Sequence, residues 1–239
     1  HAQCGEQQLL IGLGERQEEG GGRSGQHGQR IDQAPALAIG PDAQDHADQN
    51  GYALRPHTKT HKLPRFARQQ LALGARGITV QKLGEAEVMA DAGIEDIFLP
   101  YNIVGARKLE RLKALNGRVT LAVTADSPDT VAGYAATFSE DEQLTVLVEC
   151  DTGTARCGVQ TPAQALALAR QIEMAPGLRF GGLMTYPPAR RPETAETFLR
   201  EALELIESAG IRVPKVTSGN TPDMWQTGQS VVSERRPGT

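Results

Sequence analysis

Short apolar runs alternate with amphipathic segments along most of this chain, and this alternation constrains the fold more than any other feature. Runs of strand length predict strands at 53–58, 77–81, 96–100, 118–124, 144–149, 179–185 and 213–218, with 231–232 as one further candidate. Helix-like segments are expected between them, at 64–74, 85–92, 104–115, 128–137, 161–174 and 193–209. A strand and a helix that recur about every 20–35 residues predict a parallel sheet built from βα units.

The number of units favours an α/β fold of the (β/α)8 TIM-barrel type, although a doubly wound open sheet gives a similar pattern. The run at 144–148 is apolar almost throughout, as expected of a strand that is covered on both faces. After the first 48 residues about 190 remain, against ~250 in a typical complete barrel. We therefore expect an incomplete barrel that lacks a first strand.

Residues 1–48 differ from the rest because Gln and Gly dominate them. Such a segment buries too little apolar surface to offset its chain entropy, so we expect disorder there and a barrel domain over 49–239. The Gly12-Leu13-Gly14 sequence is a weak hint of a phosphate loop, since no strand–turn–helix pattern surrounds it. The chain starts at His1 and has no signal segment, so we expect a fragment of a longer protein.

Charge and cysteine content narrow the function classes. With 25 Lys and Arg against 29 Asp and Glu, neither nucleic acid nor a membrane surface is the expected partner. No run approaches the roughly 20 apolar residues of a membrane-spanning helix. Three cysteines, Cys4, Cys150 and Cys157, cannot build a disulfide framework, which predicts a cytoplasmic protein with buried or half-buried thiols.

The richest strand end is the first one, where Arg55, His57, Lys59, His61 and Lys62 fall within eight residues. On an extended chain His57, Lys59 and His61 share one face, with Arg55 behind them. Crowded cations lower the proton affinity of a lysine and make its amine nucleophilic, as Schiff-base chemistry requires. A solvated basic loop is the alternative, and a metal site is disfavoured because no carboxylate or cysteine lies nearby.

Later strand ends add further polar groups. The fifth is followed by the segment from Asp151 to Gly158, and the seventh by Thr217-Ser-Gly-Asn-Thr221. Small residues, hydroxyls and backbone N–H groups are the make-up of a phosphate cradle, although a plain αβ turn has the same composition. Asp151-Thr-Gly153 matches the aspartic-protease triplet, but that fold is all-β and needs two such aspartates. An amine and an anion site together suggest pyridoxal phosphate as one candidate cofactor among several.

The segment Arg55-Pro-His-Thr-Lys59-Thr-His-Lys62 closely resembles the cofactor-lysine segment of the D-threonine aldolase / D-serine dehydratase family. These are fold-type III pyridoxal-phosphate enzymes related to the alanine racemase N-terminal domain. The similarity continues, in the same order and spacing, to the end of the chain. It includes 81–87, 151–158, 182–186, 216–222 and 234–238.

The resemblance implies a site residue by residue. Lys59 is expected to form the Schiff base with pyridoxal 5′-phosphate and to move the Cα proton, with His57 and Arg156 in the catalytic group. Arg156 would lie beside the phenolic oxygen of the cofactor and Arg236 near its pyridine nitrogen. The remaining cofactor contacts implied are Tyr186, Thr217, Ser218, Gly219, Asn220 and, further out, Gln81.

The resemblance also implies the reaction, a retro-aldol cleavage or dehydration of a D-β-hydroxy amino acid such as D-threonine or D-serine. Family members carry a C-terminal β-domain with a divalent metal, Zn or Mn, so a metal is expected in a full-length enzyme and none in this chain. A homodimer is expected of the complete enzyme. A non-catalytic pyridoxal-phosphate-binding barrel and an amino-acid racemase are the alternatives. The Gln/Gly-rich segment stands where the family has an apolar Thr-Pro-Ala strand, so we expect residues 1–48 to be out of frame or fused from elsewhere.

Overall fold

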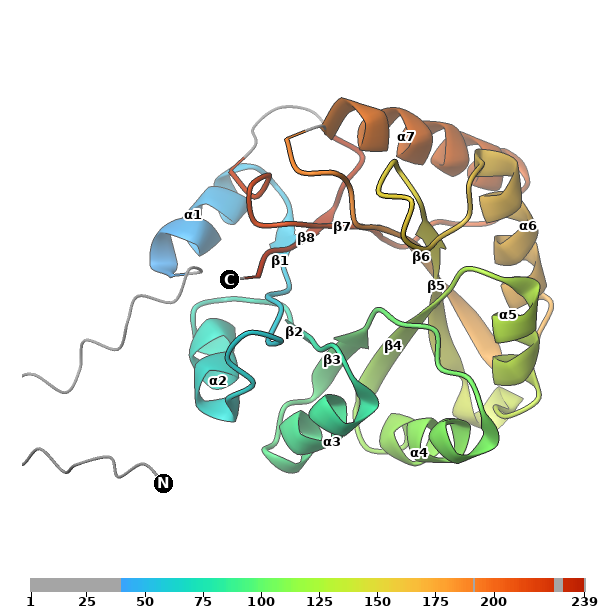
Figure 1. Ribbon diagram of the computed structural model, residues 1–239, viewed down its shortest axis with the longest axis horizontal. Helices are drawn as coiled ribbons and strands as arrows, with labels where there is room; N and C mark the ends of the chain where they lie inside the picture. Colours follow the sequence, from blue (N-terminus) through green and yellow to red (C-terminus); the bar gives the residue numbers. More distant parts are fainter. Residues whose placement is uncertain (1–39, 191, 226–229, 239) are drawn as a thin grey trace, which may run out of the picture. The chain divides into compact units, whose positions relative to one another are not determined.

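A computed structural model of the chain describes residues 40–190, 192–225 and 230–238. Its eight strands are all parallel and follow the order β1-β8-β7-β6-β5-β4-β3-β2. They form a ring with the helices outside it (Figure 1). The strands are β1 (Ala53–Leu54), β2 (Ile78–Thr79), β3 (Asp96–Leu99), β4 (Thr120–Ala125), β5 (Leu144–Cys150), β6 (Leu178–Thr185), β7 (Val216–Gly219) and β8 (Glu234–Arg236).

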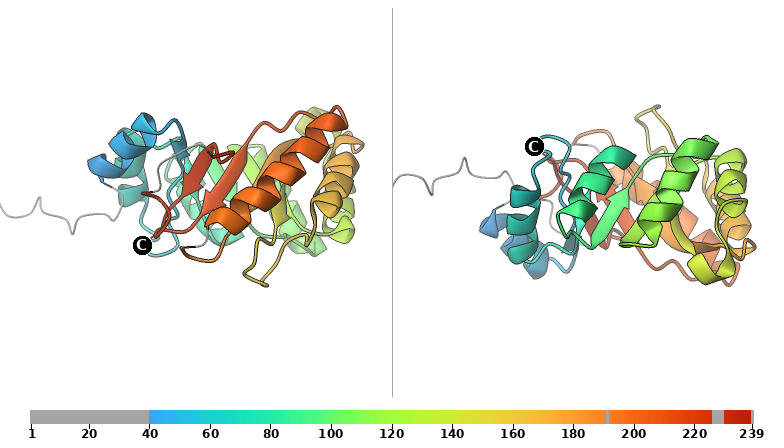
Figure 2. Two further views of the ribbon diagram at one scale, coloured as in Figure 1. Left: turned by 90° about the horizontal axis from the view of Figure 1, so that it is seen from above. Right: turned by 90° about the horizontal axis from the view of Figure 1, so that it is seen from below.

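The helices cover the outer face of the ring, as the two side views also show (Figure 2). They are α1 (Pro41–Gln49), α2 (Pro64–Ala72), α3 (Leu83–Asp91), α4 (Ala106–Asn116), α5 (Pro128–Ala135), α6 (Pro162–Glu173) and α7 (Pro192–Ser208). A short 3-10 helix spans Glu140–Glu142. The six helices expected from the sequence are therefore confirmed, and α1 is one that it did not predict.

Local signals explain where several helices begin and end. The Ser127 hydroxyl accepts a hydrogen bond from Thr130 N and caps α5, and Thr161 caps α6 in the same way through Gln164 N. Both helices start with a proline, whose missing N–H costs nothing in the first turn. Gly210 follows α7 with a φ of 81°, the left-handed conformation expected at a helix C-terminus.

Strand periodicity divides the apolar side chains between two cores. Ile97 and Leu99 belong to the large cluster between strands and helices, whereas Phe98, between them in sequence, packs with Leu147 and Met184 in a separate small cluster. This alternation is what a strand covered on both faces produces. The barrel interior is thus filled at mid-height by apolar side chains, which leaves its two ends for polar groups.

The ring is incomplete at the seam between β1 and β2. Among the described residues regular ladders join seven strand pairs, whereas these two strands are connected by a single bridge between His57 and Thr79. Two backbone hydrogen bonds, from Arg76 N to Leu54 O (2.9 Å) and from Thr79 N to Pro56 O (2.7 Å), also cross this seam. These contacts favour the barrel over an open doubly wound sheet. The expected loss of a first strand concerns residues 1–39, which lie outside the described residues, as do Cys4 and Gly12-Leu13-Gly14.

The folded part of the chain begins earlier than residue 49. Helix α1 occupies Pro41–Gln49, and its Ala43 and Ala47 are buried in a cluster with Tyr52 and Leu54. The Tyr52 hydroxyl donates to Met224 O at 2.6 Å, which ties this cluster to the far end of the chain. The expected disorder up to residue 48 is therefore wrong for residues 41–48. Two alanines on an otherwise polar helix gave little apolar signal.

Four charged side chains form a network at the amino-terminal ends of the strands, here called the floor network: Arg55, Asp96, Lys215 and Glu234. Arg55 is 2% exposed and donates through Nη1 to Asp96 (2.6 Å) and through Nε to Glu234 (2.9 Å). Lys215 Nζ lies 3.6 Å from the same Glu234 oxygen. The sequence placed Arg55 behind Lys59, but the structure places it in this network, because its side chain crosses the barrel toward the first residues of β3 and β8.

Candidate active site at the carboxyl ends of the strands

The loop after β1 carries the predicted lysine and is fixed by its own hydrogen bonds. His57 N donates to Pro237 O (2.8 Å), and the backbone N–H of Lys59 donates to His57 Nδ1 (3.2 Å). Thr58 is fully buried, and its hydroxyl donates to Thr79 O and to Glu85 Oε1, both at 3.1 Å. The backbone on both sides of Lys59 is therefore held while its amine extends 5.9 Å from the centre of the Tyr186 ring.

His57 is held as a neutral imidazole. Burial, the Lys59 ammonium and the Arg236 guanidinium lower its pKa to about 3. Its Nδ1 accepts the Lys59 N–H, which requires the unprotonated form of that nitrogen. The ring can therefore orient the Lys59 backbone without adding a positive charge beside the amine.

We expect the His57 ring to show no titration between pH 5 and 8 when followed by proton–nitrogen NMR of the imidazole. The unfolded chain takes up this proton near pH 6.5, whereas the folded chain does not until about pH 3. Because the unfolded state then binds more protons, the free energy of unfolding should fall as pH is lowered through this window. Replacement by Gln should remove the His57 share of that fall. A His57 titration centred between pH 6 and 7 would contradict this assignment.

The loop after β5 brings a second cation to Tyr186. Arg156 Cζ lies 4.6 Å from the centre of the Tyr186 ring, and one of its Nη atoms lies 3.9 Å from Glu149 Oε1. The Asp151 carboxylate shapes this loop by accepting the backbone N–H groups of Gly153 (2.9 Å) and Ala155 (3.1 Å). Burial opposes its ionisation, but these bonds lower the pKa of Asp151. Asp151 thus acts as a structural turn residue.

Glu149 was not predicted from the sequence. It is 3% exposed, accepts the Cys157 thiol at Oε1 (3.0 Å), and burial raises its pKa although Arg236 and Arg156 oppose the shift. Burial and the Glu149 carboxylate raise the pKa of Cys157 to about 11, so this thiol stays protonated at neutral pH. A carboxylate within the apolar run 144–150 was the available sequence signal. Cys150 and Cys157 are free thiols, the first buried and the second half-buried, as predicted.

Arg236 is a buried guanidinium at the end of β8. It donates through Nε to Thr217 Oγ1 (3.0 Å) and through Nη2 to Thr185 O (2.5 Å), and it lies 5.6 Å from the centre of the Phe98 ring. Burial lowers its pKa to about 10, so it remains charged at neutral pH. Thr217, expected from the sequence at a phosphate, is fully buried, and its hydroxyl accepts the hydrogen bond from this guanidinium. In the strand alternation Thr217 faces the barrel interior.

The loop after β7 contains the other predicted phosphate residues, Ser218, Gly219 and Asn220. The Asn220 amide donates to Asp223 Oδ2 (2.6 Å) and its oxygen accepts Asp223 N (2.9 Å), so this side chain closes the loop. The Thr221 hydroxyl bonds to both the carbonyl and the N–H of Gly238, which ties the loops after β7 and β8 together. The backbone and Ser218, more than the Asn220 side chain, are available for an anion.

Two glycines pack closely against these groups. A Cβ on Gly219 would lie 3.2 Å from Arg236 Nη2 and 3.3 Å from Tyr186 Cδ2. A Cβ on Gly238 would lie 3.4 Å from His57 Cβ and 4.0 Å from Lys59 Cε. The missing side chains at these two positions thus let Arg236, Tyr186, His57 and Lys59 approach the backbone of the last two strand ends. An aromatic aldehyde with an anionic group fits this surrounding of one amine and two guanidinium groups.

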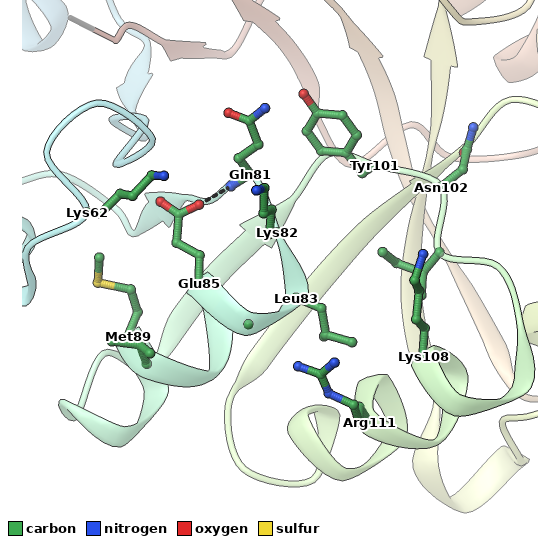
Figure 3. Close-up of a pocket in the computed structure, with 13 residues that line it drawn as sticks. Lys62, Gln81, Lys82, Leu83, Glu85, Met89, Tyr101, Asn102, Lys108 and Arg111 are labelled. Atoms are coloured by element: carbon green, nitrogen blue, oxygen red, sulfur yellow. Dashed lines mark hydrogen bonds between the residues drawn. The ribbon is translucent and has the colours of Figure 1, made fainter.

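Gln81 lies in different surroundings. It lines a pocket of about 680 Å³ with residues of α3 and α4, and its backbone N–H donates to Glu85 Oε2 at 2.9 Å (Figure 3). Tyr101 and Asn102 line the same pocket (Figure 3). The other predicted site residues are not among those that line it. The structure therefore brings together Lys59, Arg156, Tyr186 and Arg236, whereas Gln81 lines the pocket beside α3 and α4.

The described residues also bear on a membrane span and on a metal site. None of the helices in this part of the chain is long and apolar enough to cross a membrane. Among the same residues, no group of three or more His, Cys, Asp and Glu side chains is arranged to hold a metal ion.

The fold agrees with comparisons to known proteins. The chain is 38% identical to the D-threonine aldolase of an Arthrobacter species over 203 residues, which are 80% of this chain and 54% of that protein. It is 33% identical to the D-threo-3-hydroxyaspartate dehydratase of Delftia sp. strain HT23, covering 75% of this chain and 50% of that one. The crystal structure of D-threonine aldolase from Filomicrobium marinum superposes with a TM-score of 0.76 at 31% identity, over 83% of this chain and 57% of that one.

The chain thus spans about half the length of the curated relatives it matches. The family model described as the alanine racemase N-terminal domain matches residues 42–239, which include every strand of the barrel and each residue of the site. On this match the chain belongs to the alanine racemase N-terminal domain family.

Proposed function

We propose that this chain is the cofactor-binding barrel of a pyridoxal-phosphate-dependent lyase that acts on D-β-hydroxy amino acids. The observation that carries the proposal is the convergence of Lys59 and Arg156 on Tyr186, with Arg236 and Tyr186 both packed against Gly219. A D-threonine aldolase and a D-threo-3-hydroxyaspartate dehydratase among the relatives support the substrate class. D-threonine and D-serine type substrates are the ones to test.

The residue roles combine the resemblance with these positions. Lys59 would supply the amine that links covalently to the cofactor aldehyde, and the same amine would hold or deliver the proton at the substrate Cα. Arg156 would pair with the phenolic oxygen of the cofactor. Ser218 and the backbone at Gly219 and Asn220 would hold the phosphate, and neutral His57 fixes the Lys59 backbone. The bound cofactor withdraws electrons from the Cα bond that breaks.

Arg236 limits which reactions suit the site. If Arg236 stands beside the pyridine nitrogen, as the resemblance implies, its charge would keep that nitrogen unprotonated and electron withdrawal through the ring would be weaker. In a retro-aldol step the Cα–Cβ bond breaks, the β-hydroxyl proton goes to a base, and an aldehyde leaves while Cα gains a proton. Such a step benefits from help at the β-hydroxyl, for which the resemblance implies a divalent metal, Zn or Mn, in a full-length homodimeric enzyme. We further propose a cytoplasmic location, since two free thiols fit a reducing compartment.

A titration of the full chain with pyridoxal 5′-phosphate tests the proposal. We expect a visible absorption band that D-threonine shifts and L-threonine leaves unchanged. A band that responds equally to both enantiomers of alanine would instead favour a racemase, and a band that no amino acid alters would favour a non-catalytic cofactor-binding barrel. If no band forms at all, the cofactor assignment is wrong.

Gly219→Ala should weaken cofactor binding about tenfold or more, because the added methyl would press on the ends of the Arg236 and Tyr186 side chains and shift them. Measured by fluorescence titration, the loss should come without a change in melting temperature, since Gly219 has no positive φ that alanine would strain. Gly84→Ala is the matched control, because its added Cβ would meet no atom closer than 3.7 Å. Equal affinities of the two variants would refute the ring position.

A further inference from the structure

Arg236 enters the barrel interior from the last strand, and its orientation depends on one side-chain acceptor. Its Nε donates to Thr217 Oγ1 at 3.0 Å. Its other hydrogen bond among the described residues is donated by Nη2 to the backbone carbonyl of Thr185. A guanidinium held through both Nε and Nη2 has its plane fixed. Without the Thr217 oxygen, the group would keep only the carbonyl contact and could turn about it.

Thr217 lies opposite Glu234 in the parallel pairing of β7 with β8. Both side chains are buried, with exposed fractions of 0% and 2%. Glu234 Oε2 is taken by Arg55 at 2.9 Å and Lys215 at 3.6 Å. Oε1 is buried and has no hydrogen-bond partner among the described residues, and Thr217 on the neighbouring strand helps to lower the pKa of this carboxyl.

The bond from Arg236 constrains the direction of the Thr217 hydroxyl. Arg236 Nε can only donate, so the Thr217 oxygen accepts there and its proton points away from the guanidinium. Glu234 Oε1 lies on the paired strand, is buried and unpartnered among the described residues, and can only accept, so it offers an acceptor for this proton. Burial opposes ionisation of Glu234, yet Arg55 and Lys215 outweigh it and lower the pKa of this carboxyl, so it stays charged at neutral pH.

We propose that Thr217 and Glu234 are positioning residues that orient the Arg236 guanidinium toward the cofactor ring and couple it to the floor network. This inference rests on the proposed function for its catalytic meaning, whereas the orientation itself is a property of the chain alone. It assigns to Thr217 a role in the barrel interior, and to the floor network a role beyond stability.

The test compares Thr217→Val, which has the shape of threonine but no hydroxyl, with Thr217→Ser, which keeps it. In the cofactor-free chain, the Arg236 Nε–H signal in proton–nitrogen NMR should be slow to exchange in wild type. It should be lost or exchange at least about tenfold faster in Thr217→Val, since a hydrogen bond to a charged donor is removed. Thr217→Ser should restore it. Thr217→Ala repeats the measurement if the valine variant does not fold.

A second arm uses the cofactor-loaded chain. Thr217→Val should keep the visible band, because Lys59 is intact, but the pH dependence of the band should shift and cofactor affinity should fall about tenfold. Glu234→Gln should move the band in the same direction, because an amide can donate to Thr217 and compete with Arg236. Thr217→Ser should keep the wild-type pH dependence of the band and the wild-type cofactor affinity.

The outcomes separate the two proposals. If the wild type binds no cofactor, the proposed function fails, while the Arg236 signal still decides the orientation. If the wild type binds cofactor but Thr217→Val matches it in both the Arg236 signal and the pH profile, the positioning role is overturned. A shift of the band in Thr217→Val that serine does not rescue would also overturn it, because hydrogen bonding would then not be the cause.

Discussion

Replacement of Arg55 by methionine is expected to lower the free energy of unfolding by about 3–5 kcal/mol. Arg55 is the only described side chain that bridges Asp96 and Glu234, and Glu234 is 2% exposed. Methionine fills much of the same volume but leaves Lys215, at 3.6 Å, as the remaining ion-pair partner of Glu234 among the described residues. The cost of an incompletely paired buried carboxylate then adds to the loss of two short hydrogen bonds, and denaturant unfolding followed by circular dichroism measures the sum.

Arg118→Met is the matched control, because Arg118 also pairs with an aspartate, Asp91, at 2.5 Å. Both of those side chains are about half exposed or more, at 49% and 66%, so this loss should stay below about 1 kcal/mol. Similar losses in the two variants would mean that the floor network does not stabilise the barrel more than a surface pair does. The close packing of Gly77 against Arg55, where a Cβ would overlap Nη1, supports the larger effect.

Lys59→Ala should remove the visible band of the cofactor and lower lyase turnover by about 10³-fold or more, since both the covalent link and the proton-transfer amine are lost. The phosphate contacts remain, so weak non-covalent binding should persist in fluorescence titrations. Lys62→Ala is the control in the same loop, because Lys62 lines the pocket between α3 and α4. A band that survives in Lys59→Ala, or that disappears in Lys62→Ala, would contradict the assignment of Lys59.

Regular alternation made most of the fold predictable. The helices with clear start signals, such as Ser127 and Thr161, begin where the sequence places them. The last strand was expected at 231–232 but lies at Glu234–Arg236. Its three residues are all charged, and two of them are buried only because Arg55, Lys215 and Thr217 satisfy them. A hydropathy pattern cannot show such tertiary compensation.

The loops that form the site were predictable from the sequence, but the strand residues behind them, Thr217 and Glu149, were harder to place. Strand ends and family resemblance pointed to Lys59, Arg156, Tyr186 and Arg236, and the structure brings these four together. Thr217 could not be placed from its neighbours, since strand residues alternate between two faces and a one-residue change reverses them. Glu149 was missed because it is a lone carboxylate in an apolar strand. Its partners, Arg156 and Cys157, come from the loop that follows, and the sequence does not show that this loop folds back onto it.

The most direct test of the central claim is chemical trapping of the cofactor. The full chain is incubated with pyridoxal 5′-phosphate, reduced with borohydride, digested, and the modified peptide is located by mass spectrometry. The structure predicts a single major label on Lys59, because its amine adjoins Tyr186 and the glycine at 238. A label spread over Lys62, Lys82 and other exposed lysines with no preference for Lys59, or no label at all, would contradict the account.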